Sequence, residues 1–274
     1  MLFTYRPYRK IMERLLKLIT AKTPCYFISP HLDDAVLSAG SLIYRLRKKH
    51  VPVTIINVFT KVDSHTPTLS ARQFLRQCGY RDPQKLFRDR ISEDETTLRA
   101  IGCRVINLDF IDSSWRKKEK LNPVSQWLGP LIPELIHIYP TYRWHVIRGK
   151  ISENDYSLMD KIGRRLRQII SPGKNYVFSP LGNGNHVDHV IVHKVSSLIF
   201  PKTIFWSDFP YLLTSSDKDS RFSDYKKYEF PVRSENKNKL IKGYKSQVRA
   251  IFKDGHIPQM KEIYYLSRNN RYVS

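Results

Sequence analysis

Two short runs of the sequence combine imidazole and carboxylate side chains at close spacing. Residues 29–34 are Ser-Pro-His-Leu-Asp-Asp, and residues 182–189 are Gly-Asn-Gly-Asn-His-Val-Asp-His. Both side-chain types bind divalent metals such as zinc, and a catalytic zinc site needs three protein ligands and one open position for water. Neither run alone offers three well-separated ligands. Together they offer two or three histidines and three carboxylates, so the sequence predicts a metal site if the fold joins the two runs.

The elements around the two runs predict that they meet. Buried strands are expected at residues 25–29, 53–59, 105–110, 176–179 and 203–206. Helical patterns at residues 35–49, 83–101 and 187–200 alternate with them, and residues 123–170 are expected to be mostly helical. This alternation predicts an α/β fold, a Rossmann-like, mostly parallel sheet with helices on both faces. Ligands bind beyond the carboxyl ends of such strands, which is where both runs lie.

The chain is expected to form one domain over residues 1–274, because it has no internal repeat and no low-complexity linker. Its hydrophobic fraction of 41% is globular and not disordered. At the ends we expect an amphipathic helix within residues 1–22 and a helix at residues 234–250. A polar loop is expected at residues 61–70.

Cysteine usage and hydropathy indicate a cytoplasmic protein. The three cysteines, Cys25, Cys78 and Cys103, make no CxxC pair, which argues for a reducing compartment and against a cysteine zinc cluster. Cys25 fits a packing role in its strand and not a nucleophile. The sequence contains no stretch of about 18 apolar residues, so no membrane-spanning helix is expected. The charged N-terminal segment lacks a signal-peptide cleavage site.

The net charge of +22 favours anionic partners in general. The cations are dispersed, and no nucleic-acid recognition signature occurs, so most of the charge is interpreted as solvated surface and no specific nucleic-acid partner is predicted. The N-terminal helix places Ile11, Leu15, Leu18 and Ile19 on one face. This face either packs on its own domain or contacts the inner face of an anionic membrane.

The paired runs resemble those of the PIG-L or LmbE-like N-acetylglucosaminyl deacetylases, with Pro-His-x-Asp-Asp after the first strand and His-x-Asp-His after a later one. Weaker similarities occur at residues 90–102, 208–211 and 239–247. The family usually has Pro at the position of Leu32 and Glu at that of Ala35, so one contact behind the ligands differs here.

The resemblance implies a cofactor, Zn²⁺ or alternatively Fe²⁺, held by three ligands: His31, Asp34 and His189. It implies three catalytic residues: Asp33, His186 and Asp188. Asp33 would act as general base on a metal-bound water. His186, in its cationic form, would face the substrate carbonyl or protonate the leaving amine, and Asp188 would orient a histidine. Two further residues would contact sugar hydroxyls: Arg90 and Asp112.

Each of these residues also has a plainer interpretation. His31 and the adjacent aspartates could cap the following helix. Asp112 could be a turn residue, and residues 182–185 only a flexible turn. His193, four residues after His189, has the spacing of a two-histidine metal helix, but we interpret it as a surface or core residue.

The expected function is therefore removal of the acetyl group from an N-acetylated amino sugar in a glycan, glycolipid or glycoside. One alternative is a deacetylase of an aminoglycoside- or glycopeptide-type antibiotic intermediate. Another, of a different class, is a catalytically inactive basic protein that binds nucleic acid or an anionic membrane.

Overall fold

The structure is a computed structural model that describes residues 19, 23–63, 67–210, 224–230, 234–252, 254, 256–258 and 261–267. The strands are β1 (Cys25–Ser29), β2 (Val53–Lys61), β3 (Arg104–Ile111), β4 (Tyr176–Pro180), β5 (Ile204–Trp206), β6 (Tyr225–Phe230) and β7 (Glu262–Ser267). The α-helices are α2 (Asp34–Lys48), α3 (Leu69–Cys78), α4 (Pro83–Arg99), α5 (Pro123–Leu128), α6 (Tyr156–Ile169), α7 (Val187–Ile199), α8 (Ser234–Ile241) and α9 (Lys245–Ile251).

The strands form one sheet in the order β3-β2-β1-β4-β5-β7-β6. The first five strands in this order are parallel, while β7 pairs antiparallel with both β5 and β6. The predicted α/β class and mostly parallel sheet are therefore confirmed. The chain leaves β1 toward β2 on one side, whereas β4 lies on the other side. The strand order thus reverses between β1 and β4, where ligands bind in sheets of this kind.

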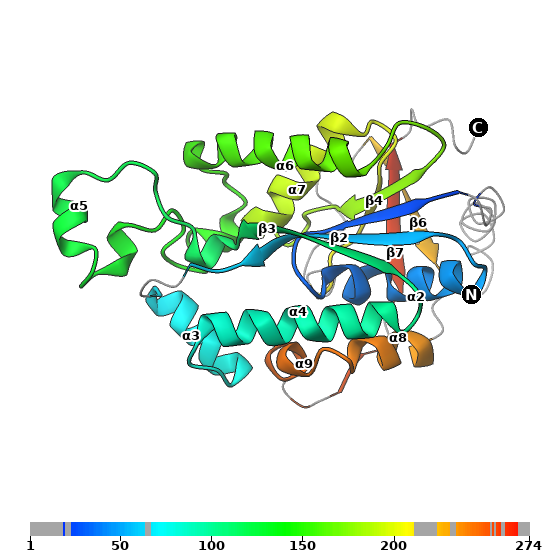
Figure 1. The fold of residues 1–274 in the computed structure, drawn as a ribbon, viewed down its shortest axis with the longest axis horizontal. Coiled ribbons are helices and arrows are strands. Elements are labelled where there is room, and N and C mark those ends of the chain that lie inside the picture. Colours follow the sequence, from blue (N-terminus) through cyan, green and yellow to red (C-terminus); the bar gives the residue numbers. More distant parts are fainter. Residues whose placement is uncertain are drawn as a thin grey trace, which may run out of the picture.

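Helices cover both faces of the sheet, with α6 and α7 on one face and α2, α4, α8 and α9 on the other (Figure 1). The central strands are apolar on both sides, so consecutive residues enter different cores. Phe27 joins the core beneath α2, and Ile28 joins the core beneath α6 and α7. The rings of Phe27 and Phe178 stack with centroids 4.4 Å apart. This stacking holds β1 against β4, and the turns that follow them therefore start side by side.

The C-terminal elements are tied to α2 by a buried carboxylate. Backbone angles depart from helical values at Ala39, and the N–H groups of Ser41 and Leu42 then donate to Glu262 of β7 at 2.7 and 3.1 Å. Lys237 of α8 pairs with the same carboxylate at 3.2 Å. A break in a buried helix leaves backbone donors that need partners, and Glu262 supplies them.

The structure corrects three expectations about secondary structure. Residues 69–78, which were not assigned a helix, form α3, capped by the Thr68 side chain and ended by Gly79 at φ +80°. Between α5 and α6 the chain consists mainly of turns and short 3-10 segments rather than helix. The single helix expected at residues 234–250 is two helices, separated by a turn at residues 242–244. Gly243 lies in this turn and packs so closely on Thr97 of α4 that a Cβ would lie 2.1 Å from its Oγ1.

The amphipathic helix expected within residues 1–22 lies outside the described residues, except for Ile19, which is buried in the α2 core. Within the part of the chain that the structure describes, the helices are too short or too polar to cross a membrane.

Candidate active site

The turn between β1 and α2 holds the first of the two runs in a fixed conformation. The Ser29 hydroxyl donates to the His31 carbonyl at 2.6 Å and accepts from the Ala35 N–H at 3.0 Å. The His31 N–H donates to Asp34 Oδ2 at 2.9 Å. Because a strand ends here and a helix begins, Asp33 and Asp34 leave the backbone in different directions and can take different roles.

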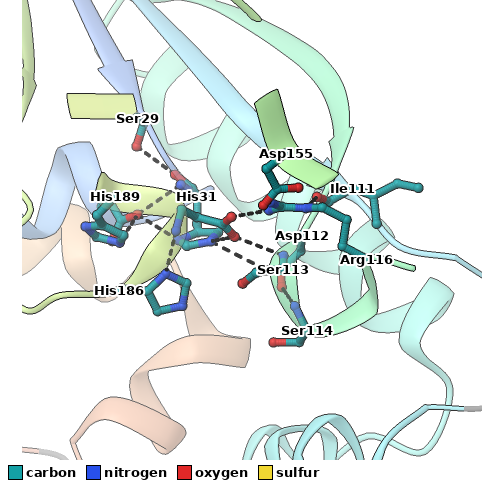
Figure 2. Close-up of polar contacts among 12 residues, drawn as sticks. Ser29, His31, Ile111, Asp112, Ser113, Ser114, Arg116, Asp155, His186 and His189 are labelled. Carbon is teal, nitrogen blue, oxygen red and sulfur yellow. Dashed lines mark hydrogen bonds and ion pairs between the residues drawn. The ribbon is translucent and has the colours of Figure 1, made fainter. Parts of the chain in front are cut away.

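Three ligand atoms from the two runs converge at the carboxyl ends of β1 and β4. Asp34 Oδ2 lies 3.0 Å from His31 Nδ1 and 3.2 Å from His189 Nε2. All three side chains are buried. The structure therefore brings together the residues that the resemblance implied as metal ligands, and Figure 2 shows both histidines facing the same point.

The outer nitrogen of each histidine contacts another carboxylate. His31 Nε2 lies 3.2 Å from Asp188 Oδ2, and His189 Nδ1 lies 2.8 Å from Asp208 Oδ1. Such pairs fix the ring orientation and the tautomer of a metal-binding histidine. The histidine that Asp188 contacts is therefore His31.

Asp208 is a functional candidate that sequence reasoning did not assign. Its Oδ2 accepts from the N–H groups of Gly182 and Asn183 at 2.6 and 3.2 Å, so it also closes the turn before α7. Gly182 has φ +78°, a conformation that favours glycine. Residues 182–185 therefore form a turn held by Asp208. The sequence signal that could have identified Asp208 was the resemblance of residues 208–211 to the family.

Arg116 is a second residue that sequence reasoning missed. Its buried guanidinium pairs with Asp188 and, at 2.6 Å, with Asp155 (Figure 2). Tyr139 donates its hydroxyl proton to the same oxygen of Asp155 at 2.6 Å. The Ser113 N–H donates to Asp188 Oδ2 at 3.0 Å. Both carboxylate oxygens of Asp188 therefore have partners, Oδ1 in Arg116 and Oδ2 in His31 and the Ser113 N–H.

These pairings shift the pKa values of the buried groups. Burial lowers the pKa of His31, but its hydrogen bonds to Asp188 and Asp34 outweigh burial and raise the pKa to about 9. Burial raises the pKa of Asp188, but the Arg116 charge and His31 outweigh it and hold the pKa well below its usual range. Likewise, the positive charge of His189 overcomes burial and lowers the pKa of Asp34.

Asp33 lies beside the ligand set without belonging to it. Its Oδ1 contacts the Arg90 guanidinium at 3.3 Å, and both side chains are buried. Burial raises the pKa of Asp33, with the Arg90 charge acting against the rise. A carboxylate whose pKa is raised is better suited to accept a proton near neutral pH. Arg90, which was expected to contact sugar, lines the pocket and also holds Asp33.

His186 lies opposite these groups, with its ring 5.0 Å from that of His31 and 5.2 Å from that of His189. Burial and the charges of those two histidines lower its pKa well below the usual value. The cationic form expected for His186 is therefore not favoured. Its Nδ1 accepts from the Asp188 N–H at 3.3 Å, which leaves Nε2 to carry the proton of the neutral ring.

Asp112 fits both interpretations offered for it. Its Oδ1 accepts from the Ser114 N–H at 2.8 Å and caps a 3-10 turn, while its Oδ2 lies 3.5 Å from His31 Nε2. Asp112 lines a pocket of about 400 Å³ together with Asp33, Arg90 and His186. Pockets of this size accommodate small-molecule ligands.

Cys25 lies outside this pocket in the core, where burial raises the pKa of its thiol to about 12.

The donor set could hold a divalent metal. His31, Asp34 and His189 each offer one ligand atom, and these three atoms lie within 4.8 Å of one another. A second group, His31 with His186 and Asp188, also meets that distance. Arg116 disfavours the second group, because its positive charge already neutralises Asp188. His193, one turn after His189, instead places Nδ1 3.1 Å from the Pro180 carbonyl oxygen.

Behind Arg90, Asp94 carries a further perturbed carboxyl group. Asn57 Nδ2 and the Tyr244 hydroxyl each donate to it at 2.7 Å. Burial raises the pKa of Asp94 from 3.8 to about 7, outweighing both hydrogen bonds. Tyr244 immediately precedes α9, so its hydrogen bond to Asp94 ties α4 to the C-terminal helices.

Comparisons with known proteins bear on the family and the fold of the chain. The family model described as "PIG-L: GlcNAc-PI de-N-acetylase" matches residues 26–200, which run from β1 through α7 and include both runs. No curated protein matches the chain.

Several solved structures share the fold. A deacetylase–teicoplanin complex from the biosynthesis pathway of teicoplanin is 20% identical, with a TM-score of 0.69, covering 90% of this chain and 100% of that one. The zinc-inhibited form of teicoplanin deacetylase is 19% identical, with a TM-score of 0.67 and coverages of 91% and 100%. The A40926 pseudoaglycone deacetylase is 20% identical, with a TM-score of 0.64 and coverages of 89% and 97%.

The ligand assignment predicts how substitutions change metal binding. His189→Ala should lower zinc affinity by more than about 100-fold, and Asp208→Asn by about 10- to 100-fold, because it releases the outer nitrogen of His189. Titration calorimetry on the metal-stripped protein measures both. His193→Ala is the matched control on the same helix and should bind as the wild type does. Unchanged zinc affinity in His189→Ala would contradict the assignment.

Asp94 predicts a pH dependence of stability. Its pKa is higher in the folded protein than its ordinary value of 3.8, so between the two values the folded state keeps a proton that the unfolded chain has released. The stabilisation is complete below the lower value and is lost as pH rises toward the higher one. Relative to Asp94→Asn, the wild type should lose about 2 kcal/mol between about pH 5 and pH 7. Urea denaturation of both proteins measures this, and parallel pH profiles would rule it out.

Proposed function

The chain belongs to the PIG-L family, and from this premise we propose that it is a metal-dependent hydrolase that deacetylates an N-acetylated amino sugar of N-acetylglucosamine type. The observation that carries the proposal is the position of Asp33. Its carboxylate is buried beside three converging ligand atoms, shares a pocket with them, and is not one of them. Metal-assisted amide hydrolysis uses metal ligands together with a separate general base that does not bind the metal, and Asp33 is placed to be that base.

In this proposal His31, Asp34 and His189 hold the metal, which is Zn²⁺ or alternatively Fe²⁺. When bound, such an ion polarises the amide carbonyl and lowers the pKa of water toward neutrality. The local charge supports a cation. Although the chain as a whole carries +22, buried carboxylates outnumber the two buried guanidinium groups of Arg90 and Arg116 around the site.

Asp33 acts as the general base. It takes a proton from water as the water oxygen forms a bond to the acetyl carbonyl carbon. Arg90 holds one carboxylate oxygen of Asp33 at 3.3 Å and thereby orients the group. When the C–N bond breaks, the proton on Asp33 can pass to the departing amine, so that acetate and a free amino sugar result.

His186 supports the same step from the opposite side of the pocket. As a neutral ring with its proton on Nε2, it donates a hydrogen bond to the carbonyl oxygen as negative charge develops there. Asp188 contributes twice, since its N–H orients His186 and its carboxylate orients His31.

The substrate occupies a pocket whose wall offers Asp112, Gln73 and Gln77 to sugar hydroxyls and the Tyr142 ring to an apolar sugar face. Asp112 and Arg90 are the proposed substrate-contacting residues of the sequence prediction, and Arg90 now also serves Asp33. The N-acetylated sugar of the substrate belongs to a glycan, glycolipid or glycoside. Three buried thiols fit the reducing, cytoplasmic compartment inferred from sequence.

The role of Asp33 is tested by Asp33→Asn. We expect acetate release from N-acetylglucosamine derivatives to fall by about 10²- to 10⁴-fold, the usual contribution of a general base, with metal content unchanged. Acetate is measured by an enzyme-coupled assay and metal by mass spectrometry. Asp160→Asn, at an exposed position of α6, is the control and should retain full activity.

The same assay tests the metal requirement. A chelator should abolish acetate release by the wild type, and added zinc or ferrous ion should restore it. Full turnover by Asp33→Asn would contradict the base assignment. Release that persists after chelation would contradict the metal-dependent mechanism.

A further inference from the structure

Exposed apolar side chains are concentrated at the end of the molecule that carries the active site. Among the described residues, nine large apolar side chains are exposed. Six of them belong to residues 117–150, and we call these six the apolar tip: Val124, Trp127, Leu131, Ile132, Tyr142 and Trp144. Soluble surfaces rarely gather apolar side chains in this way without a binding role.

The segment that carries the apolar tip projects from the body of the protein. It follows β3, and α5 extends beyond the end of the sheet at which β2 and β3 stop (Figure 1). Trp127 is 78% exposed and Leu131 is 80% exposed. Closer to the sheet, Tyr142 lines the active-site pocket, and its ring lies 6.4 Å from that of His186. The apolar tip therefore extends from the pocket wall outward.

The projection is held in place and is not a loose loop. Lys118 N–H donates to the Ile136 carbonyl and Ile138 N–H to the Arg116 carbonyl, each at 2.9 Å. Glu134 accepts from the N–H of Leu69 at the start of α3 at 2.8 Å. At Gly129 an added Cβ would lie 2.4 Å from Ile136. The apolar side chains are thus presented outward by a braced backbone.

The charges around the apolar tip indicate what it contacts. Residues 117–150 contain six lysines and arginines and only two glutamates. Of these, Lys120, Arg143, Arg148 and Lys150 are exposed. Tryptophan and tyrosine prefer the boundary between water and lipid. Basic side chains near that boundary are attracted to anionic headgroups. Basic side chains flank the apolar ones, with Lys120 before Val124 and Arg143 between Tyr142 and Trp144.

We propose that the apolar tip docks on an anionic membrane surface, with Trp127, Leu131 and Trp144 entering the headgroup region and the neighbouring lysines and arginines contacting lipid phosphates. Docking places the pocket mouth, through Tyr142, at the bilayer surface. The proposal does not depend on the deacetylase activity, because it concerns binding alone.

The test measures binding of the full chain to vesicles of phosphatidylcholine with and without phosphatidylglycerol. The wild type should sediment with the anionic vesicles, and its affinity should fall as salt rises. Trp127→Ala/Trp144→Ala should lower the partition coefficient by about tenfold or more. Its emission, which then comes from the buried Trp115 and Trp206, reports whether the fold is intact.

A matched pair separates the apolar tip from general surface hydrophobicity. Leu131 and Leu198 are equally exposed, at 80%, but Leu198 lies near the end of α7, which runs away from the active site. Leu131→Ala should weaken vesicle binding, and Leu198→Ala should leave it unchanged.

Three results would overturn the proposal. The first is absence of wild-type binding to anionic vesicles. The second is equal binding by Trp127→Ala/Trp144→Ala and the wild type, which would place any membrane contact elsewhere. The third is self-association without vesicles that the double substitution abolishes, which would identify a second copy of the chain as the occupant of the apolar tip.

Discussion

The site depends on two buried histidines that are each held between two carboxylates. Asp34 contacts the inner nitrogens of both His31 and His189, while Asp188 and Asp208 contact the outer ones. Charged groups are costly to bury unless they are paired with good geometry. Each imidazole can therefore occupy one orientation only, with one nitrogen aimed at the shared point beside Asp34.

The fold supplies this arrangement by joining chain segments that are far apart in sequence. β1 and β4 are neighbours, so the turns after them deliver His31 and His189 to the same edge of the sheet. Arg116 and Asp208 come from the regions after β3 and β5 and close the network on both sides. The same reversal of strand order leaves an opening above the strands, and this opening becomes the pocket. Architecture and chemistry are thus set by one feature, the placement of β4 beside β1.

How much of the fold and of the site could be predicted depends on how far apart in the sequence the interacting residues lie. Buried strands such as β2 are visible as short apolar runs rich in β-branched residues, and the ligands were predicted because the two runs resemble those of the family. The partners of the histidines are harder to predict. Arg116 is an ordinary polar residue in sequence, and Asp208 lies in a stretch that resembles the family only weakly, so the contacts of both became clear only from the tertiary structure. The pKa of His186 likewise depends on two other rings, which is why its neutral form was not anticipated. The close packing of the turn at Gly243 on Thr97 is likewise a contact across 146 positions of the chain.

The central claim is that the shared point beside Asp34 binds the metal and that Asp33 does not. Anomalous diffraction at the absorption edge of the metal, from crystals of the zinc-loaded protein, tests this most directly. The account predicts one ion in contact with His31 Nδ1, Asp34 Oδ2 and His189 Nε2, with the Asp33 carboxylate outside its ligands. An ion held instead by His31, His186 and Asp188, the other group with suitable spacing, would contradict it.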